Sequence, residues 1–393
     1  MAAVRSCFAL ILFCAAVVVL RAQVPAPFGG VVFEDANGNG QRDTGERGLG
    51  GIAVSNQHDV VQTVADGTYT LPRSGFGVVF VSLPDGYRAV GRFWRTVPSS
   101  GAKEPADFAL QPHESQPTFT FIHASDTHVS KQSVARLQQL RSVVEARRPD
   151  FVLVTGDLVR DALRVGEEEA RGYYDLYVEE TGRFPVPVWS VPGNHENFGI
   201  ERHLSKVSTS HPLYAKGMYR QRLGPNYYSF TYGGVHFVGL DSVDIADLWY
   251  YGHIDSTQLA WLRSDLQSLP PGVPVVTFNH IPFVSAVDQV SGYRDDGTAP
   301  TLIKVDGRTV FRHTVSNFQD VLTILQPREW PLALGGHFHT RESIQYASSV
   351  RTRFHQAAAV VGPTDNPVPA ISGVTLYRVT NRVINDGEFV PLR

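Results

Sequence analysis

The chain has 393 residues, of which 42% are hydrophobic and 19% charged, a composition typical of a globular protein with an ample core. Its formal net charge of −3 gives no basic stripe, so binding of nucleic acid through its phosphates is not indicated. One large domain or two ordinary ones is the expectation from the length, and the 35 glycines and 25 prolines favour a β-rich, turn-rich chain.

Residues 1–23 are predicted to be a secretory signal. Arg5 supplies a positive start, and the apolar run 8–20 is too short to span a membrane comfortably. The expected mature chain is therefore exported (periplasmic, secreted or surface-associated) and has no transmembrane span; an uncleaved anchor is the alternative. Both cysteines, Cys7 and Cys14, lie in this segment, so a metal site in the mature chain must use nitrogen and oxygen ligands.

Residues 24–112 are predicted to form a small all-β domain. Short apolar or alternating runs separated by Gly, Asp and Pro turns are typical of a β-sandwich. The predicted strands are 30–33, 52–55, 60–64, 68–71 and 78–82. A linker is expected at residues 111–117.

A calcium-loop pattern lies inside this domain. Asp35-x-Asn37-x-Asn39-Gly40, followed five residues later by Glu46, matches the spacing of a twelve-residue EF-hand loop. The candidate calcium ligands are Asp35, Asn37, Asn39, the carbonyl of Gln41, Asp43 and Glu46. No helix is predicted on either side of the loop, so a Gly/Asn-rich turn without an ion is the alternative.

Residues 113–393 are predicted to form a second domain, in which strands and helices alternate from residue 118 onward. A β-α-β-α-β order predicts parallel strands with right-handed crossovers. The predicted strands are 119–124, 151–155, 186–191, 273–278 and 332–335, and the predicted helices are 129–147, 166–180 and 256–269. A hairpin is expected at 227–240, an irregular polar insertion at 284–320, and short strands without a helix at 342–392.

Polar residues follow five of these strands at the point where each strand ends. They are Asp126 and His128, Asp157, Asn194 and His195, His280, and His337 and His339. Because the carboxyl ends of the strands of an α/β sheet share one crevice, we expect these side chains to converge there. Asp and Asn residues that cap turns, or histidines buried in the core, could explain any one of these placements. They would not explain all five together.

Two Asp, one Asn and four His are too many ligands for one tetrahedral ion, with His195 left over. The set suits two ions that share a carboxylate, and mixed imidazole and carboxylate ligands favour Mn, Fe or Zn over Ca or Mg. A metal pair of this kind activates a hydroxide and clamps the oxygens of a phosphoryl displacement. Gly156 and Gly193 are predicted to let the backbone turn sharply beside Asp157 and Asn194.

The motifs Asp126-x-His128, Gly156-Asp157-x-x-x-Asp161, Gly193-Asn194-His195-Glu196, His280 and Gly336-His337-x-His339 resemble the full set of the calcineurin-like metallophosphoesterases. Order and spacing both agree, over about residues 118–380. The resemblance implies an α/β (α+β) fold, a four-layer αββα sandwich with a dinuclear centre. It implies that Asp126, His128 and His339 hold one ion, that Asn194, His280 and His337 hold the other, and that Asp157 bridges them. His195 would then be catalytic, protonating the leaving group or contacting a phosphate oxygen. Glu196 is expected either to orient His195, the favoured role, or to cap the next turn.

Other resemblances bear on the specific function. Purple acid phosphatases place a tyrosine three residues after the bridging Asp, where this chain has Arg160, so an iron–tyrosinate centre is not expected. The run 157–161 is closer to the branch that includes bacterial cyclic-nucleotide phosphodiesterases. The domain at 24–112 is similar to the immunoglobulin-like repeat of bacterial surface proteins and to the N-terminal domain of some secreted metallophosphoesterases.

The expected function is thus that of an exported, metal-dependent phosphoesterase that hydrolyses phosphomonoesters or phosphodiesters of small molecules through a hydroxide activated by two metals. One alternative is a cyclic-nucleotide phosphodiesterase. Another, of a different class, is a calcium-dependent surface adhesion protein with a vestigial phosphatase fold, although a vestigial site should have lost ligands. No protein partner can be inferred.

The insertion at 284–320 carries six residues that could contact a phosphate or a base, although solvated loop charge is the favoured interpretation of each: Tyr293, Arg294, Lys304, Arg308, Arg312 and His313.

Overall fold

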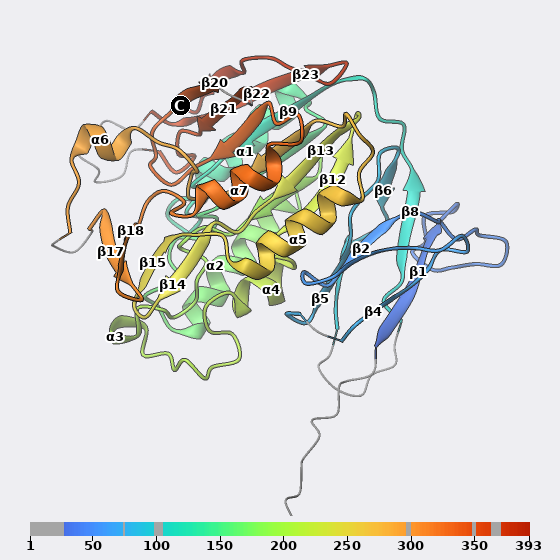
Figure 1. Ribbon diagram of the computed structural model, residues 1–393, viewed down its shortest axis with the longest axis horizontal. Coiled ribbons are helices and arrows are strands. Elements are labelled where there is room, and N and C mark those ends of the chain that lie inside the picture. Colours follow the sequence, from blue (N-terminus) through green and yellow to red (C-terminus); the bar gives the residue numbers. More distant parts are fainter. Residues whose placement is uncertain (1–26, 74, 98–104, 296–299, 348–350, 363–370) are drawn as a thin grey trace, which may run out of the picture.

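The computed structural model describes residues 27–73, 75–97, 105–295, 300–347, 351–362 and 371–393. The predicted signal segment at 1–23 lies outside the described residues. The described chain forms a small all-β module, at the right of Figure 1, beside a larger part built from two central sheets and flanking helices.

Two four-stranded sheets make up the β module. The first has the order β4-β1-β8-β6, and the second β3-β2-β5-β7. The bounds are β1 Phe28–Glu34, β2 Ala53–Ser55, β3 Val60–Gln62, β4 Thr68–Leu71, β5 Val78–Val81, β6 Tyr87–Ala89, β7 Trp94–Thr96 and β8 Phe108–Pro112. The five predicted strands are confirmed as β1 to β5. Three strands were not predicted: β6 and β7, which are three residues long, and β8, whose end overlaps the start of the predicted linker.

The first sheet of the larger part has the order β11-β10-β9-β22-β23, with β24 paired to β22. Strands β9 (Thr118–Ala124), β10 (Phe151–Thr155) and β11 (Val188–Val191) are parallel, as predicted. Strands β22 (Gly373–Thr380), β23 (Val383–Ile384) and β24 (Glu388–Pro391) follow in antiparallel pairings. Helices α1 (Val134–Arg147) and α2 (Glu167–Thr181) pack on one face, where Ile122 and Ala124 alternate with residues that face the second sheet.

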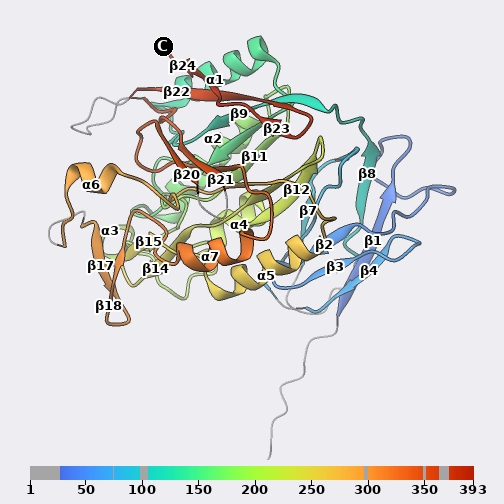
Figure 2. The ribbon, with the colours of Figure 1, turned by 45° about the horizontal axis from the view of Figure 1, so that its top comes forward.

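The second sheet has the order β12-β13-β16-β19-β21-β20. Its strands are β12 (Tyr228–Tyr232), β13 (Val235–Gly239), β16 (Val275–Phe278), β19 (Leu332–Gly335), β20 (Glu342–Ala347) and β21 (Arg351–Gln356). Helices α5 (Ser256–Gln267) and α7 (Phe318–Leu325) cover its outer face, opposite to the side on which α1 lies (Figure 2). Between the sheets, Phe121 and Phe151 pack against Phe237. The expected four-layer αββα sandwich is confirmed.

The insertion at 284–320 was predicted to be irregular, and this prediction is wrong for part of it. It contains α6 (Val287–Ser291) and the hairpin of β17 (Leu302–Val305) and β18 (Arg308–Phe311). A second hairpin, β14 (Val243–Ala246) with β15 (Trp249–Gly252), and the short helices α3 (Arg202–Ser205) and α4 (Gly217–Leu223) were also not predicted. Each is too short to show a clear hydrophobic period.

The β module packs directly against the larger part. Gln57 is buried and donates a hydrogen bond to the carbonyl of Tyr227, while Leu83 forms a β-bridge with Phe230 of the second sheet. The ring of Phe80 contacts that of Trp261 on α5 at a centroid distance of 6.3 Å. These buried contacts fix the module against the larger part, so it is not a domain held only by a flexible linker.

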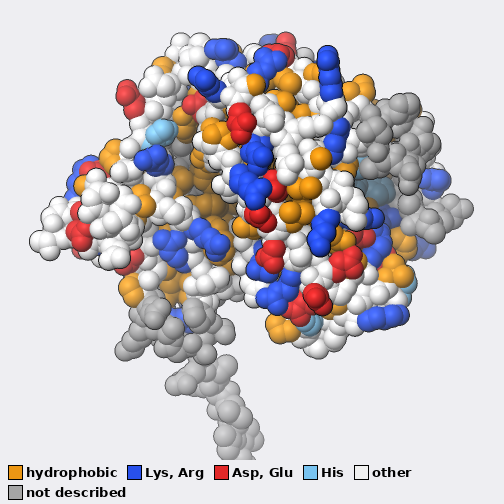
Figure 3. Space-filling view, turned by 180° about the vertical axis from the view of Figure 1, so that it is seen from behind, with side chains coloured by type: hydrophobic (Ala, Val, Ile, Leu, Met, Phe, Trp, Pro, Cys, Tyr) orange, Lys and Arg blue, Asp and Glu red, His pale blue; other side chains and the backbone are white. Residues whose placement is uncertain are grey.

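Among the described residues, no helix is both long and apolar enough to cross a bilayer. Acidic and basic side chains are interspersed on the face seen from behind (Figure 3). That face therefore carries no broad patch of a single sign.

Candidate metal centre

All seven predicted metal ligands lie just beyond the carboxyl ends of strands, as the sequence analysis expected. They come from both sheets, after β9, β10 and β11 in the first and after β16 and β19 in the second. Five of the seven have a left-handed backbone, with φ between 39° and 78°: Asp126, His128, Asp157, His337 and His339. Because left-handed backbone is unfavourable for residues other than glycine, its concentration here marks a site whose geometry the surrounding fold imposes.

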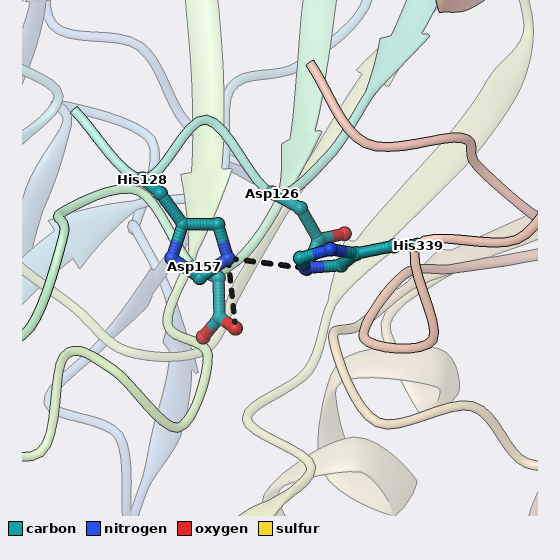
Figure 4. Close-up of side chains that lie close together, drawn as sticks. All are labelled: Asp126, His128, Asp157 and His339. Carbon is teal, nitrogen blue, oxygen red and sulfur yellow. Dashed lines mark hydrogen bonds and ion pairs between the residues drawn. The ribbon is translucent and has the colours of Figure 1, made fainter. Parts of the chain in front are cut away.

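One group of ligands consists of Asp126, His128, Asp157 and His339, whose side chains point toward one another (Figure 4). The Nε2 atoms of His128 and His339 are 3.1 Å apart. Asp126 Oδ1 lies 3.2 Å from His339 Nε2, and Asp157 Oδ2 lies 3.6 Å from His128 Nε2. Two imidazole nitrogens and two carboxylates thus converge on one position.

The second group consists of Asp157, His280 and His337, with Asn194 beside it. His280 Nε2 lies 3.2 Å from Asp157 Oδ1, 3.2 Å from His337 Nδ1 and 3.1 Å from Asn194 Oδ1. His280 Nδ1 donates to the carbonyl of Thr155 at 2.8 Å, so Nε2 is the nitrogen directed at the site. The two oxygens of Asp157 therefore face different groups, as a bridging carboxylate requires.

The protonation states differ within the ligand set. Burial lowers the pKa of His128 to about 4 and that of His337 well below its usual value, so both imidazoles are neutral. Burial opposes ionisation of Asp157, but the imidazoles of His280 and His195 outweigh it and hold the carboxyl pKa well below its usual value.

The carboxylates act in the opposite direction on the other two imidazoles: against burial, Asp157 raises the pKa of His280 to about 9, and Asp126 raises the pKa of His339. An ion bound there would displace a proton from each of these imidazoles. Imidazoles and carboxylates are the ligands that such ions take, so these residues fit two ions.

The glycines of the motifs serve two different needs. Gly156 has a left-handed φ of 81°, which confirms the predicted sharp turn. Gly193 is not left-handed, so the prediction was wrong for that residue. A Cβ there would lie 2.2 Å from Asp157 Oδ1 and 2.3 Å from Asp157 N. Gly193 is required by the close approach of two strand ends.

His195 is held by the backbone of Arg160. Its Nδ1 donates to the Arg160 carbonyl at 2.6 Å, and its Nε2 lies 3.9 Å from Asp157 Oδ2. Of the two roles expected for Glu196, orientation of His195 was wrong and capping of the backbone agrees better with the structure. The Glu196 carboxylate is buried and accepts hydrogen bonds from the backbone N–H groups of Gly193 and Val159 instead.

A pocket of about 560 Å³ opens over both groups. Besides the ligands and His195, its lining includes Ser130, Gln132, Ser133, Arg160, Tyr250 and Val361. Tyr250 comes from the unpredicted β14–β15 hairpin, so no sequence signal pointed to it. Of the six candidates in the insertion, His313 reaches the site, where its Nδ1 lies 2.7 Å from His337 Nε2.

The six predicted calcium ligands share one loop of the β module. Asp35 is buried, and its carboxylate accepts backbone N–H groups of Gly38 and Gly40, each at 2.7 Å. The amides of Asn37 and Asn39 both donate to Asp43 Oδ2 at 2.8 Å. Within the described residues, the acidic and histidine clusters that could hold a metal ion are the two groups above. The loop is closed by its own hydrogen bonds.

Solved structures similar to this chain include a dimetal phosphatase from Danio rerio, at 16% identity and a TM-score of 0.44, over 71% of this chain and all of that one. Another is the anchor of the inner membrane complex of Plasmodium, at 14% identity and a TM-score of 0.42, over 70% of this chain and 85% of that one.

Two curated proteins are similar in sequence. A probable cyclic nucleotide phosphodiesterase of Rhodococcus erythropolis is 27% identical over 179 residues, which are 42% of this chain and 54% of that protein. A 3',5'-cyclic-nucleotide phosphodiesterase of Nostoc sp. is 23% identical over 274 residues, 64% of this chain and 86% of that protein. The chain thus spans about half the length of the first of these relatives and most of the second.

Family models match both parts of the chain. Residues 36–113 match the N-terminal domain of calcineurin-like phosphoesterases, and residues 119–341 match the calcineurin-like phosphoesterase domain itself. The second match covers more than half of the chain, and its two ligand groups share one carboxylate. The protein is therefore a member of the calcineurin-like phosphoesterase family, a hydrolase that acts on phosphoester bonds.

Proposed function

We propose that this protein is an exported, two-metal phosphoesterase that hydrolyses phosphomonoesters or phosphodiesters of small molecules. The observation that carries the proposal is Asp157, whose two oxygens face two separate groups of ligands. A single-metal or vestigial site would not need seven convergent ligands from five strand ends.

Asp126, His128 and His339 would hold one ion, and Asn194, His280 and His337 the other, with Asp157 shared. The absence of cysteine from the site favours Mn, Fe or Zn held by nitrogen and oxygen. Bound ions of this kind supply an activated water and neutralise charge on phosphate oxygens.

His195 is the proposed proton donor. Because Nδ1 is held by the Arg160 carbonyl, Nε2 is the nitrogen directed at the pocket. A proton on Nε2 can pass to the oxygen of the departing alcohol, which is too basic to leave unprotonated. Arg160 lines the same pocket and offers a positive charge to a substrate phosphate.

A cyclic-nucleotide phosphodiesterase is the second candidate, because both curated relatives carry that name. Against it, an exported enzyme would have poor access to intracellular cyclic nucleotides. The ring of Tyr250, which is largely buried but lines the pocket, would suit a base or another flat leaving group as well as an alkyl one.

A hydrolysis screen decides between these candidates. The purified protein, stripped of metal and reloaded with Mn(II), would be assayed on aryl phosphomonoesters and diesters, cyclic nucleotides, nucleotides and pyrophosphate. We expect turnover of esters that chelator abolishes and Mn(II) restores. Full activity after metal removal would refute the two-metal mechanism, and turnover confined to cyclic nucleotides would favour the second candidate.

We also propose that residues 1–23 direct export and that residues 24–112 form a domain with a calcium loop beside a phosphoesterase domain at 113–393. Coordination by Asn37 and Asn39 would require their carbonyl oxygens to replace the amide nitrogens now directed at Asp43. Fractionation of cells that express the chain with and without residues 1–23 tests export. Retention of both forms inside the cell would contradict it.

A further inference from the structure

His313 lies outside the motifs of the family but contacts one of the candidate metal ligands. It follows β18 in the insertion, and its ring lies edge to edge with that of His337, with a centroid distance of 4.9 Å and an interplanar angle of 27°. The contact joins His313 Nδ1 to His337 Nε2 at 2.7 Å. One of these two nitrogens must carry the hydrogen.

The position of His337 indicates which one does. His337 Nδ1 faces the second group of ligands, where an ion needs its lone pair. The hydrogen of a neutral His337 therefore belongs on Nε2, and His313 Nδ1 accepts it.

His337 is thereby set in one tautomer. Its Nε2–H donates to His313 Nδ1, and its own Nδ1 keeps a free lone pair. That Nδ1 lies 3.2 Å from His280 Nε2, within the second group of ligands. With the opposite tautomer, a hydrogen on Nδ1 would occupy the position where an ion has to bind.

The surroundings of His313 hold its imidazole in place. The adjacent Arg312 is buried, with its guanidinium 4.3 Å from the ring centroid of Tyr250 and 4.6 Å from that of Trp249. The Tyr250 ring in turn lies beside the rings of His313 and His337, with centroid distances of 6.1 and 5.9 Å.

We propose that His313 is a positioning residue of the metal centre: it accepts the Nε2 hydrogen of His337 and so presents His337 Nδ1 to the second ion. The inference rests on the proposed two-metal function and adds to it a residue supplied by this chain's insertion. Orienting partners of metal-bound histidines commonly contribute about 10–100-fold to metal affinity.

The test compares three variants by Mn(II) binding, measured by equilibrium dialysis of the full chain without substrate. In His313→Asn, the amide oxygen takes the place of Nδ1 and keeps the acceptor. His313→Gln carries the same amide one bond further out, in place of Nε2, and His313→Phe removes the acceptor altogether. We expect the wild type and His313→Asn to bind two ions with similar affinity. We expect the Gln and Phe variants to bind one ion as before and the other about 10–100-fold more weakly.

Several outcomes would overturn the inference. Two ions bound by His313→Phe at wild-type affinity would show that His337 needs no partner. Equal weakening in all three variants, or a comparable fall of Tm in the metal-free variants, would assign His313 a merely structural role. If the wild type itself bound fewer than two ions, the proposed function would fail and this inference with it. If the wild type bound two ions and His313→Phe bound them equally well, the inference alone would fail.

Discussion

The close approach of Gly193 to Asp157 gives a sharp prediction. A Cβ at residue 193 would lie 2.2 Å from Asp157 Oδ1 and 2.3 Å from Asp157 N, whereas non-bonded carbon contacts are at least about 3.5 Å. Asp157 has little freedom to yield, because Oδ1 accepts the His195 N–H at 3.0 Å. Relief therefore requires the two strand ends to separate by roughly 1 Å, and such overpacking costs about 1–3 kcal/mol.

For Gly193→Ala we therefore expect a lower Tm of the metal-free protein, weaker binding of both Mn(II) ions, and a loss of turnover of about 100-fold, the usual effect of a 1 Å misplacement. Both ions should weaken because both ligand groups include Asp157. Gly172→Ala is the matched control, since a Cβ there meets nothing within 4 Å in an exposed turn of α2. That variant should be more stable by about 0.5–1 kcal/mol. Wild-type binding of both ions and wild-type turnover in Gly193→Ala would refute the steric reasoning.

Three further substitutions address other features. His195→Asn keeps an amide donor for the Arg160 carbonyl but removes Nε2, and should lower kcat by about 10²–10⁴-fold while two Mn(II) ions remain bound; loss of an ion would make His195 a ligand. Burial lowers the pKa of His355 in the folded protein to about 3. As the pH drops, His355 is therefore protonated in the unfolded state before it is protonated in the folded state. The free energy of unfolding should fall between about pH 6.5 and pH 3 for this reason. In metal-free His355→Asn, urea titrations should show this fall reduced by up to about 1.4 kcal/mol per pH unit, and an unchanged slope would contradict the assignment. Calcium should raise the Tm of the full chain but not of Glu46→Gln, and an equal effect on both would argue for a loop without an ion.

The sequence predicted the ligands because each one directly follows a strand. The end of a parallel strand is a position that hydrophobic period locates well, and the shared rim then brings distant residues together. The same logic placed His195 in the pocket, since it is adjacent to Asn194. Roles within the turn were harder to predict. Glu196 and Gly193 differ from expectation because their partners, Val159 and Asp157, come from a neighbouring strand end.

Residues that reach the site from elsewhere gave no such signal. Tyr250 lies in one hairpin and His313 directly follows another, and the strands of both hairpins are only four residues long. The approach of both residues to the metal centre depends on how these hairpins fold over the rim. His313 was one of six candidates in a polar segment, and composition alone could not separate it from Lys304 or Arg308, which lie on the exposed β17–β18 hairpin. Only a three-dimensional arrangement distinguishes a solvated charge from an orienting partner.

The β module illustrates the same limit on a larger scale. Its composition predicted a β-sandwich, and a separate binding domain was then a reasonable hypothesis. The structure instead buries Gln57 against Tyr227 and continues the second sheet through the Leu83–Phe230 bridge, while the pocket lining among the described residues comes entirely from the larger part. Removing the module would expose the ring of Trp261 and leave buried hydrogen-bonding groups unpaired. A module attached in this way acts first through the stability of the sheet whose far end carries His280 and His337, and any effect of calcium on catalysis would have to pass through that sheet.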